Sequence, residues 1–377
     1  MTRRKQARWL LRRVAIGFAI AASLGGADFE WSLPKGFPRP AVPADNPMSI
    51  AKVELGRYLF YDKRMSVNGK ESCGSCHRQE LAFTDGRAHA EGTTAEAHPR
   101  SSMSLVNVAF APYLTWANGT LTSLEEQALT PMLGEVPIEL GLKGHEGEFL
   151  AAAKSTPVYQ RLFPAAFQGE SDPYTLKNVT KAIAAFERSI VSVRSPYDSY
   201  RYGGDRSAIS AAAKRGEIVF GSGERGGCFQ CHGGWNFSGG ILYESSGGME
   251  RETEPGGGFF NTGVSLYAAP NRGLYEQTQK EADMGKFKVP TLRNIAVTAP
   301  YMHDGSMATL DEVIDHYSAG GKYDDPNKSR MVHQRSLTKD DRSDLIEFLE
   351  TLTDEEMLHD ARWSDPWIQT KVPSTQR

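Results

Sequence analysis

Cysteine is scarce in this chain, with four residues among 377, and all four belong to two Cys-x-x-Cys-His stretches. The first stretch runs from Cys73 to His77 and the second from Cys228 to His232. Because no other thiol remains, the sequence excludes a disulfide framework, a zinc site away from these stretches and a separate cysteine nucleophile.

The chain also lacks an apolar run long enough to span a bilayer. The longest run, residues 14–24, is well short of the roughly 20 residues that a transmembrane helix needs. It follows a basic start with no acidic residue, residues 1–13, and it precedes the small residues Gly25 to Ala27. We therefore predict a secretory signal peptide over residues 1–27, and a protein that is soluble after its removal.

Basic residues are in deficit. The whole chain has 43 Lys and Arg against 46 Asp and Glu, and removal of residues 1–27 leaves 37 against 46, a balance of −9. Proteins that bind nucleic acid need basic patches for the phosphate backbone. The composition therefore argues against a nucleic-acid partner.

The Cys-x-x-Cys-His pattern is the attachment signature of a c-type haem. Each thiol adds across one haem vinyl group, and the histidine reaches the iron as proximal ligand. One copy alone would leave a zinc half-site or a redox dithiol open, but two complete copies favour two haems. Haem is attached outside the bacterial cytoplasm, so motifs and signal together predict a periplasmic protein. The predicted haem-binding residues are Cys73, Cys76 and His77 for the first haem, and Cys228, Cys231 and His232 for the second.

The two motifs lie 155 residues apart, which predicts two domains with one haem each. A helix-breaking Ser195-Pro196 step places the boundary between residues 28–195 and 196–377. Strand patterns are few, so the predicted class is mainly α, with two cytochrome c-like haem domains and long irregular loops. Amphipathic helices are expected at residues 49–61, 176–192, 207–220 and 337–352, and the irregular loops at residues 233–285.

Two further helices are expected from their N-terminal capping patterns. Thr122 with Glu125 forms one capping box and Thr309 with Glu312 forms another. Pro131 is expected to limit the first of these helices. The expected helices before the two motifs, at residues 49–61 and 207–220, also suggest a weak internal repeat.

Several stretches resemble the bacterial dihaem cytochrome c peroxidase superfamily. They follow one another along most of the mature chain, together with both haem motifs. These stretches are Lys288 to Asn294, Thr298 to Gly305, Trp116 to Gly119, Leu124 to Gln127 and Pro137 to Gly141.

The resemblance implies a particular ligand for the second haem. Ordinary peroxidases of the superfamily use a Met where this chain has Tyr317, fourteen residues after His303. A Tyr at this position marks the MauG-like branch, whose members oxidise residues of a partner protein. Tyr317 is therefore expected to bind the iron opposite His232. One alternative is that Tyr317 is only a core aromatic residue, and the other is that His316 is the ligand.

The arm around Trp31 and the segments 114–118 and 134–137 are most similar to the MbnH-like, methanobactin-cluster enzymes of that branch. For those enzymes the resemblance implies oxidation of a partner tryptophan to kynurenine.

The resemblance makes the first haem the site that reacts with hydrogen peroxide. Glu139 would then move a proton between the peroxide oxygens, Gln127 and Pro131 would line the pocket, and Trp116 would carry charge between the haems. A solvated carboxylate is the alternative for Glu139, and a buried core side chain for Trp116.

Two loop histidines and a possible calcium site complete the implied features. In ordinary peroxidases a loop His blocks the first iron; His89 and His98 have a suitable place, but we interpret both as surface residues.

Family members hold calcium through backbone oxygens that correspond to Thr298 and Pro300. The family's Asn ligand corresponds here to Ser101, and Asn107 is a possible substitute.

The predicted function is therefore that of a periplasmic dihaem enzyme. It would use hydrogen peroxide to reach a two-ferryl state and would oxidise an aromatic residue, expected to be tryptophan, on a secreted partner. One alternative is an ordinary dihaem peroxidase that takes electrons from a small cytochrome, against which Tyr317 argues. The other is a dihaem electron carrier, against which Glu139 and Gln127 argue, since a carrier needs no acid beside its iron.

Overall fold

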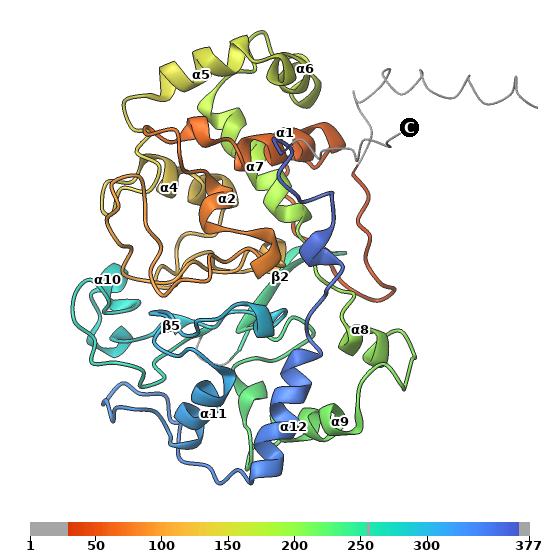
Figure 1. The fold of residues 1–377 in the computed structure, drawn as a ribbon, viewed down its shortest axis with the longest axis vertical. Coiled ribbons are helices and arrows are strands. Elements are labelled where there is room, and N and C mark those ends of the chain that lie inside the picture. The colour runs from red at the N-terminus through yellow and green to blue at the C-terminus, as the bar shows by residue number, and fades with distance from the viewer. Residues whose placement is uncertain (1–28, 255–256, 369–377) are drawn as a thin grey trace, which may run out of the picture.

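The computed structural model describes residues 29–254 and 257–368, and helices predominate over strands among them (Figure 1). The predicted signal peptide lies outside the described residues. The helices are α1 (Ile50–Phe60), α2 (Cys73–Cys76), α3 (Leu124–Gln127), α4 (Leu129–Leu133), α5 (Glu146–Ser155), α6 (Pro157–Ala166), α7 (Leu176–Ser189), α8 (Pro196–Arg201), α9 (Ala211–Phe220), α10 (Tyr275–Thr278), α11 (Leu310–Ser318) and α12 (Lys339–Glu350). The strands are β1 (Arg39–Pro40), β2 (Gly240–Ser245), β3 (Gly248–Thr253), β4 (Phe259–Phe260) and β5 (Phe287–Lys288).

Each half of the chain is built around one pair of closely packed helices. In the upper part of Figure 1, α1 packs on α7, and in the lower part α9 packs on α12. Each pair has a glycine at its contact: a Cβ on Gly56 would lie 1.9 Å from the Ala182 carbonyl oxygen, and one on Gly216 would lie 1.9 Å from that of Asp344. The helix before each Cys-x-x-Cys-His motif is thus held in the same way, which supports the internal repeat.

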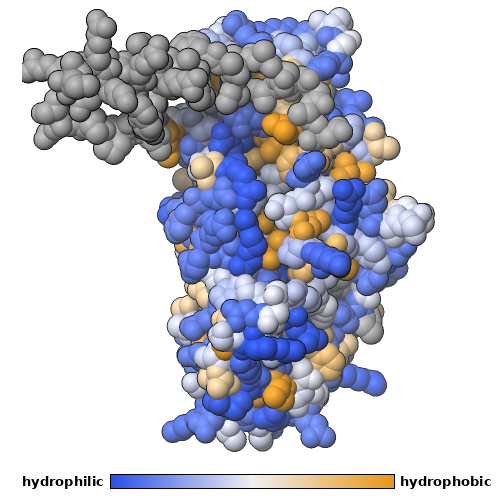
Figure 2. Space-filling model, turned by 90° about the vertical axis from the view of Figure 1, so that its right-hand side faces the viewer, coloured by the Kyte–Doolittle hydropathy of each residue, from blue (hydrophilic) through white to orange (hydrophobic). Residues whose placement is uncertain are grey.

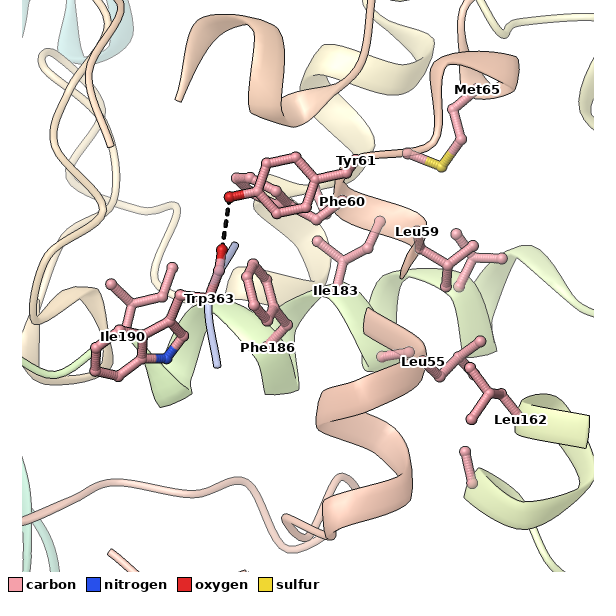
Figure 3. Close-up of a cluster of buried hydrophobic side chains, with 14 of the residues drawn as sticks. Leu55, Leu59, Phe60, Tyr61, Met65, Leu162, Ile183, Phe186, Ile190 and Trp363 are labelled. Carbon is pink, nitrogen blue, oxygen red and sulfur yellow. Dashed lines mark hydrogen bonds between the residues drawn. The ribbon is translucent and has the colours of Figure 1, made fainter. Parts of the chain in front are cut away.

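The first hydrophobic core surrounds α1 and α7 and also contains side chains from the end of the chain. Figure 3 shows Leu55, Phe60 and Phe186 in this core, together with Trp363. The hydroxyl of Tyr61 donates to the Trp363 carbonyl (2.7 Å). The residues after α12 therefore return to the half of the molecule that carries the first motif, across the boundary predicted at residue 195, which itself stays a prediction.

The second core lies between α9, α12 and α11, with Phe220, Phe237 and Phe348 in contact with one another. A smaller cluster joins the N-terminal arm to the rest of the chain. In it, Phe37 of the arm meets Trp235 edge to face, with ring centroids 5.1 Å apart. Strand β1 of the arm pairs with β2, and this pairing binds the arm to the second half.

The predicted cap of α3 is wrong by one residue. Ser123, and not Thr122, accepts a hydrogen bond from the N–H of Glu126 (3.3 Å). Glu125 cannot close a capping box because its carboxylate is bound by Arg188 (2.7 and 2.8 Å). Helix α3 ends at Gln127, before Pro131, which agrees with the predicted limit. Pro131 is the third residue of the next helix, α4. The N–H groups of a helix's first turn have no partner within the helix, so the missing N–H of proline costs no hydrogen bond there.

The other helix predictions are correct in place and differ at their ends. Thr309 caps α11 through the N–H of Glu312 (3.2 Å), but the Glu312 carboxylate accepts from Ala308, so the predicted box is half formed. Helix α7 ends at Ser189 instead of residue 192, and α9 begins after its cap Ser210 instead of at residue 207. These are the usual uncertainties of helix ends.

The expectation of purely irregular loops over residues 233–285 is wrong for the β2–β3 hairpin. The two strands pair antiparallel from Gly240 with Thr253 to Ser245 with Gly248, leaving a two-residue Ser246-Gly247 turn. Such a turn containing glycine is a recognised hairpin signal. The hairpin was not predicted because the many glycines of this stretch indicated irregular loops.

Among the described residues, no helix combines the length and the apolar character needed to cross a membrane. Figure 2 shows that polar side chains cover most of the described surface on the right-hand side of the molecule, where apolar side chains form small separate groups.

Candidate functional site

The first Cys-x-x-Cys-His motif lines a cavity, which we call the first-motif cavity. Helix α2 carries the two cysteines, and its Gly74 lies so close to Tyr61 that a Cβ there would be 2.3 Å from the ring. The structure brings to this cavity most residues that the sequence assigned to the peroxide site. Its lining includes Cys73, Cys76, His77, His98, Gln127, Pro131, Glu139 and Glu187.

Both motif histidines are oriented for binding a metal through Nε2. His77 Nδ1 lies 2.8 Å from the Phe83 carbonyl, and His232 Nδ1 lies 3.1 Å from the Pro290 carbonyl. Because a carbonyl only accepts, each Nδ1 carries the hydrogen and each Nε2 keeps its lone pair. Burial lowers the pKa of both residues, that of His232 to about 4, so both are neutral at physiological pH.

None of the four motif cysteines is paired in a disulfide. Burial raises the pKa of Cys76 and Cys228 to about 12 and that of Cys231 to about 11. Zinc binding and dithiol exchange both use thiolates, which these surroundings disfavour. Two cysteines followed by a neutral, oriented histidine therefore fit covalent haem attachment better than either alternative.

Glu139 is held inside the first-motif cavity by the backbone around it. The N–H of Leu140 donates to the Pro131 carbonyl (2.9 Å), which fixes the Glu139 segment to α4. The N–H of Thr93 donates to the Glu139 carbonyl (2.8 Å) from the other side. Burial raises the pKa of the Glu139 carboxyl, so a solvated surface role does not describe it. Gln127 and Pro131 line the same cavity from α3 and α4.

The two loop histidines differ from each other. His89 is exposed, as predicted, and its Nδ1 donates to the His98 carbonyl (3.0 Å). The surface interpretation is wrong for His98, which is half-buried and lines the first-motif cavity. The N–H of Arg100 donates to His98 Nδ1 (3.2 Å), so the hydrogen of the neutral ring is on Nε2. In this arrangement His98 can donate a hydrogen bond but cannot bind a metal through Nε2.

The second motif lines another cavity, the second-motif cavity, together with Tyr317. Helix α11 brings Tyr317 to the cavity that also contains His232. The neighbouring His316 does not line it; its Nε2 lies 2.9 Å from the Thr262 carbonyl instead. Burial raises the pKa of the Tyr317 phenol, so a metal ion would have to displace its proton. The geometry favours Tyr317 over His316.

His303 and Lys288 also belong to the second-motif cavity, and the sequence analysis gave neither a role. His303 stacks on Phe287 with ring centroids 3.6 Å apart, and its Nε2 is buried without a partner among the described residues. Burial lowers the pKa of His303 to about 4 and that of Lys288 to about 8. Both lie in stretches that carry the resemblance, which was the available signal.

Trp116 lies between two cavities. It lines the second-motif cavity and a central cavity next to it, but it does not line the first-motif cavity. Its Nε1 donates to the Ser101 carbonyl (2.9 Å), so the indole is fixed and half-buried. The position is compatible with both the relay role and the core role.

The central cavity also contains the residues predicted to bind calcium, Thr298, Pro300 and Ser101. The side chain of Asn107 is not free to substitute, because its amide donates to Ser192 and Asn236 and its oxygen accepts from the Ser192 N–H. Calcium prefers several oxygen ligands, carboxylates among them. No Asp or Glu of the described chain lines this cavity, so these residues alone are an incomplete fit.

Glu187 on α7 also lines the first-motif cavity, and it was not predicted from the sequence. The available signal was its place in the apolar stripe of that helix, between Ile183 and Ile190, where a charged residue is unexpected.

Comparison with known proteins agrees with this arrangement. A family model described as di-haem cytochrome c peroxidase matches residues 50–207. Cytochrome-c peroxidase IdrP1 of Denitromonas iodatirespirans is 36% identical over 94% of this chain and 94% of its own length. Methylamine utilization protein MauG of Methylorubrum extorquens is 33% identical over 85% of this chain and 82% of its own. The crystal structure of a MauG-like protein associated with microbial copper homeostasis has a TM-score of 0.85 at 42% identity, covering 90% of this chain and 99% of that one. With two oriented Cys-x-x-Cys-His motifs and relatives over nearly its whole length, the chain belongs to the di-haem cytochrome c peroxidase and MauG family of haem-dependent oxidoreductases.

Proposed function

We propose that this protein is a periplasmic enzyme that reduces hydrogen peroxide and uses the oxidising equivalents on an aromatic residue of a secreted partner protein. The observation that carries the proposal is Tyr317, which shares the second-motif cavity with His232. Family membership alone does not decide the electron source, because the relatives include both cytochrome-c peroxidases and MauG.

Tyr317 supports storage of an oxidising equivalent at the second haem. A phenolate is a hard anionic ligand that stabilises the higher oxidation states of iron, whereas a Met thioether favours Fe(II). A second haem with His232 and Tyr317 would therefore hold an equivalent strong enough to remove electrons from an indole. Tryptophan is the expected partner residue and kynurenine the expected product.

The haems would supply the redox chemistry, and the chain would supply attachment, orientation and protons. We propose that residues 28–195 and 196–377 form two cytochrome c-like halves, each holding one haem through its two cysteines and its histidine. Glu139 would take the proton from one peroxide oxygen and give it to the other, since burial raises its pKa and makes its carboxylate a better proton acceptor. Gln127 would orient the peroxide by hydrogen bonding, and Trp116 would carry charge between the haems.

A calcium ion near Thr298 and Pro300 remains a proposal with an incomplete ligand set, and no step is assigned to it. Metal analysis of the purified holoenzyme tests it directly. One equivalent of calcium that survives dialysis supports the site, and none contradicts it.

The partner reaction can be tested with the purified holoenzyme, hydrogen peroxide and the secreted protein encoded beside this chain. We expect peptide mapping to show an oxidised tryptophan on that partner. Tyr317→Met, which restores the ligand of ordinary peroxidases, should abolish this modification while both haems stay attached. Tyr301→Phe is the matched control: it removes another hydroxyl of the same cavity, one that donates to the Ile295 carbonyl (3.2 Å).

An ordinary dihaem cytochrome c peroxidase is the second candidate, favoured by the peroxidase relatives. An unmodified partner together with rapid peroxide reduction by a reduced small cytochrome would establish that activity instead.

A further inference from the structure

Glu187 is a buried carboxyl that faces the first-motif cavity from α7. Its side chain is 5% exposed, and it lines the same cavity as Cys73, His77 and Glu139. Its Oε2 has no hydrogen-bond partner within the described chain. A buried carboxylate without a partner is strongly disfavoured, so this group needs either a proton or a ligand in the cavity.

The nearest cation does not neutralise Glu187. Arg188 directs both terminal nitrogens to Glu125, at 2.7 and 2.8 Å, and Asn46 also donates to Glu125 (2.6 Å). The negative charge of Glu125 adds to the effect of burial, and together they outweigh the attraction of Arg188. The pKa of Glu187 is raised to about 8, so the carboxyl carries a proton at neutral pH.

We propose that Glu187 is a second proton-donating residue of the peroxide site, acting beside Glu139. The two carboxyls reach the cavity from different elements, Glu187 from α7 and Glu139 from the loop after α4. This inference rests on the proposed reduction of peroxide at the first motif. It does not depend on whether a partner protein or a small cytochrome provides the electrons.

The proton balance of peroxide reduction gives such a group a role. Reduction of one hydrogen peroxide to two water molecules consumes two electrons and two protons. Glu139 only moves a proton that the peroxide already has, so the two additional protons must come through the chain. As each electron arrives from the aromatic residue or the cytochrome, the O–H bond of Glu187 breaks and its proton passes into the cavity. The resulting carboxylate then takes a proton from solvent through the cavity, whose lining includes the exposed Glu91 and Glu96.

Other titratable groups surround Glu187. Arg188 is its neighbour on α7, Glu125 approaches from α3 and the Cys73 thiol from α2. Glu71, Glu139, His77 and His98 line the same cavity. Variants must therefore identify the group that titrates.

Infrared spectroscopy of the resting holoenzyme tests the protonation state without turnover. A protonated carboxylic acid has a carbonyl stretch separate from that of a carboxylate, and the band shifts in heavy water. We expect such a band at neutral pH, lost in Glu187→Gln and replaced by a shifted band in Glu187→Asp. Glu80→Gln is the matched control, because Glu80 is exposed and ion-paired with Arg78, and the band should persist. A band that is unchanged in Glu187→Gln, in a variant with full haem content, would refute the proposal.

Proton uptake during turnover tests the role. With a pH indicator in stopped flow, Glu187→Gln should slow proton uptake roughly 100-fold, the lower end of general-acid effects, and Glu187→Asp should restore part of the rate. Equal uptake rates in wild type and Glu187→Gln would overturn the role. A reduced small cytochrome serves as electron donor in this experiment, so the result does not depend on oxidation of a partner protein. Failure of partner oxidation would contradict the proposed function but would leave this test valid.

Discussion

At the scale of single residues, Glu139 and its neighbour Glu135 provide a direct comparison. Glu139 lies in the first-motif cavity, whereas Glu135 is exposed and paired with Lys143. Glu139→Gln keeps the shape of the side chain and removes its ability to move a proton. We expect peroxide cleavage, followed in stopped flow, to slow roughly 100- to 10,000-fold with both haems retained. Glu135→Gln should leave the rate unchanged; a large effect there and none at Glu139 would reverse the assignment.

Glu187 should also make stability depend on pH. Its pKa is about 8 in the folded protein, against 4.5 for an unburied glutamate. Between these values the folded state binds one more proton than the unfolded state, so this residue lowers the free energy of unfolding as the pH rises. Glu187→Gln removes that contribution. The melting temperature of Glu187→Gln minus that of wild type should therefore increase from pH 5 to pH 8. A difference in melting temperature that does not change with pH would contradict the shifted pKa.

The residues that the sequence could identify are those whose spacing is fixed by chemistry. Two thiols and a histidine in five positions are dictated by the haem itself, and the position of Tyr317 followed from a resembling motif. The burial of His98 and His303 could not be predicted in this way, whereas Glu187 lies in the apolar stripe of α7. The surroundings of the two histidines come from loops and helices distant in the sequence, and burial of a polar side chain depends on all of them.

At the scale of secondary structure, the contacts α1–α7 and α9–α12 depend on two glycines. A Cβ on Gly56 or Gly216 would clash with carbonyl oxygens of the facing helix, which are backbone atoms and cannot rotate away. Overpacking typically costs about 1–3 kcal/mol, and we expect Gly56→Ala and Gly216→Ala to destabilise by at least that much. Denaturant unfolding measures the effect. Gly147→Ala in α5 is the control, because nothing lies within 4 Å of its added Cβ and no loss of stability is expected.

Local sequence patterns left two features of the secondary structure undetermined, the cap of α3 and the β2–β3 hairpin. The α3 cap moved by one residue because Arg188, 63 residues away, takes the Glu125 carboxylate that a capping box would need. The β2–β3 hairpin is hard to predict because β3 is exposed along its length and lacks the apolar alternation of a half-buried strand. Helices with a clear apolar stripe, such as α7, were correctly placed because their pattern comes from the core they cover.

At the scale of the whole molecule, the C-terminal tail after α12 couples the two halves. The tail runs from the second half to the first, where Trp363 is buried and its Nε1 donates to the Ser189 carbonyl (3.1 Å). Its backbone carbonyl accepts from Tyr61, beside the first motif. The stability of the half with the first haem therefore depends on residues that follow the second.

Trp363→Ala should consequently weaken the first half and leave the second unchanged. Removal of a buried Trp side chain costs about 3–5 kcal/mol, and Trp363 belongs to the first core and not to the second. Hydrogen exchange should accelerate in α1 and α7 while α9 and α12 keep their protection. Trp367→Ala is the control, since Trp367 lies in the same tail but is 37% exposed, and its effect should be smaller. Equal acceleration in both helix pairs would show instead that the two halves unfold as one cooperative unit.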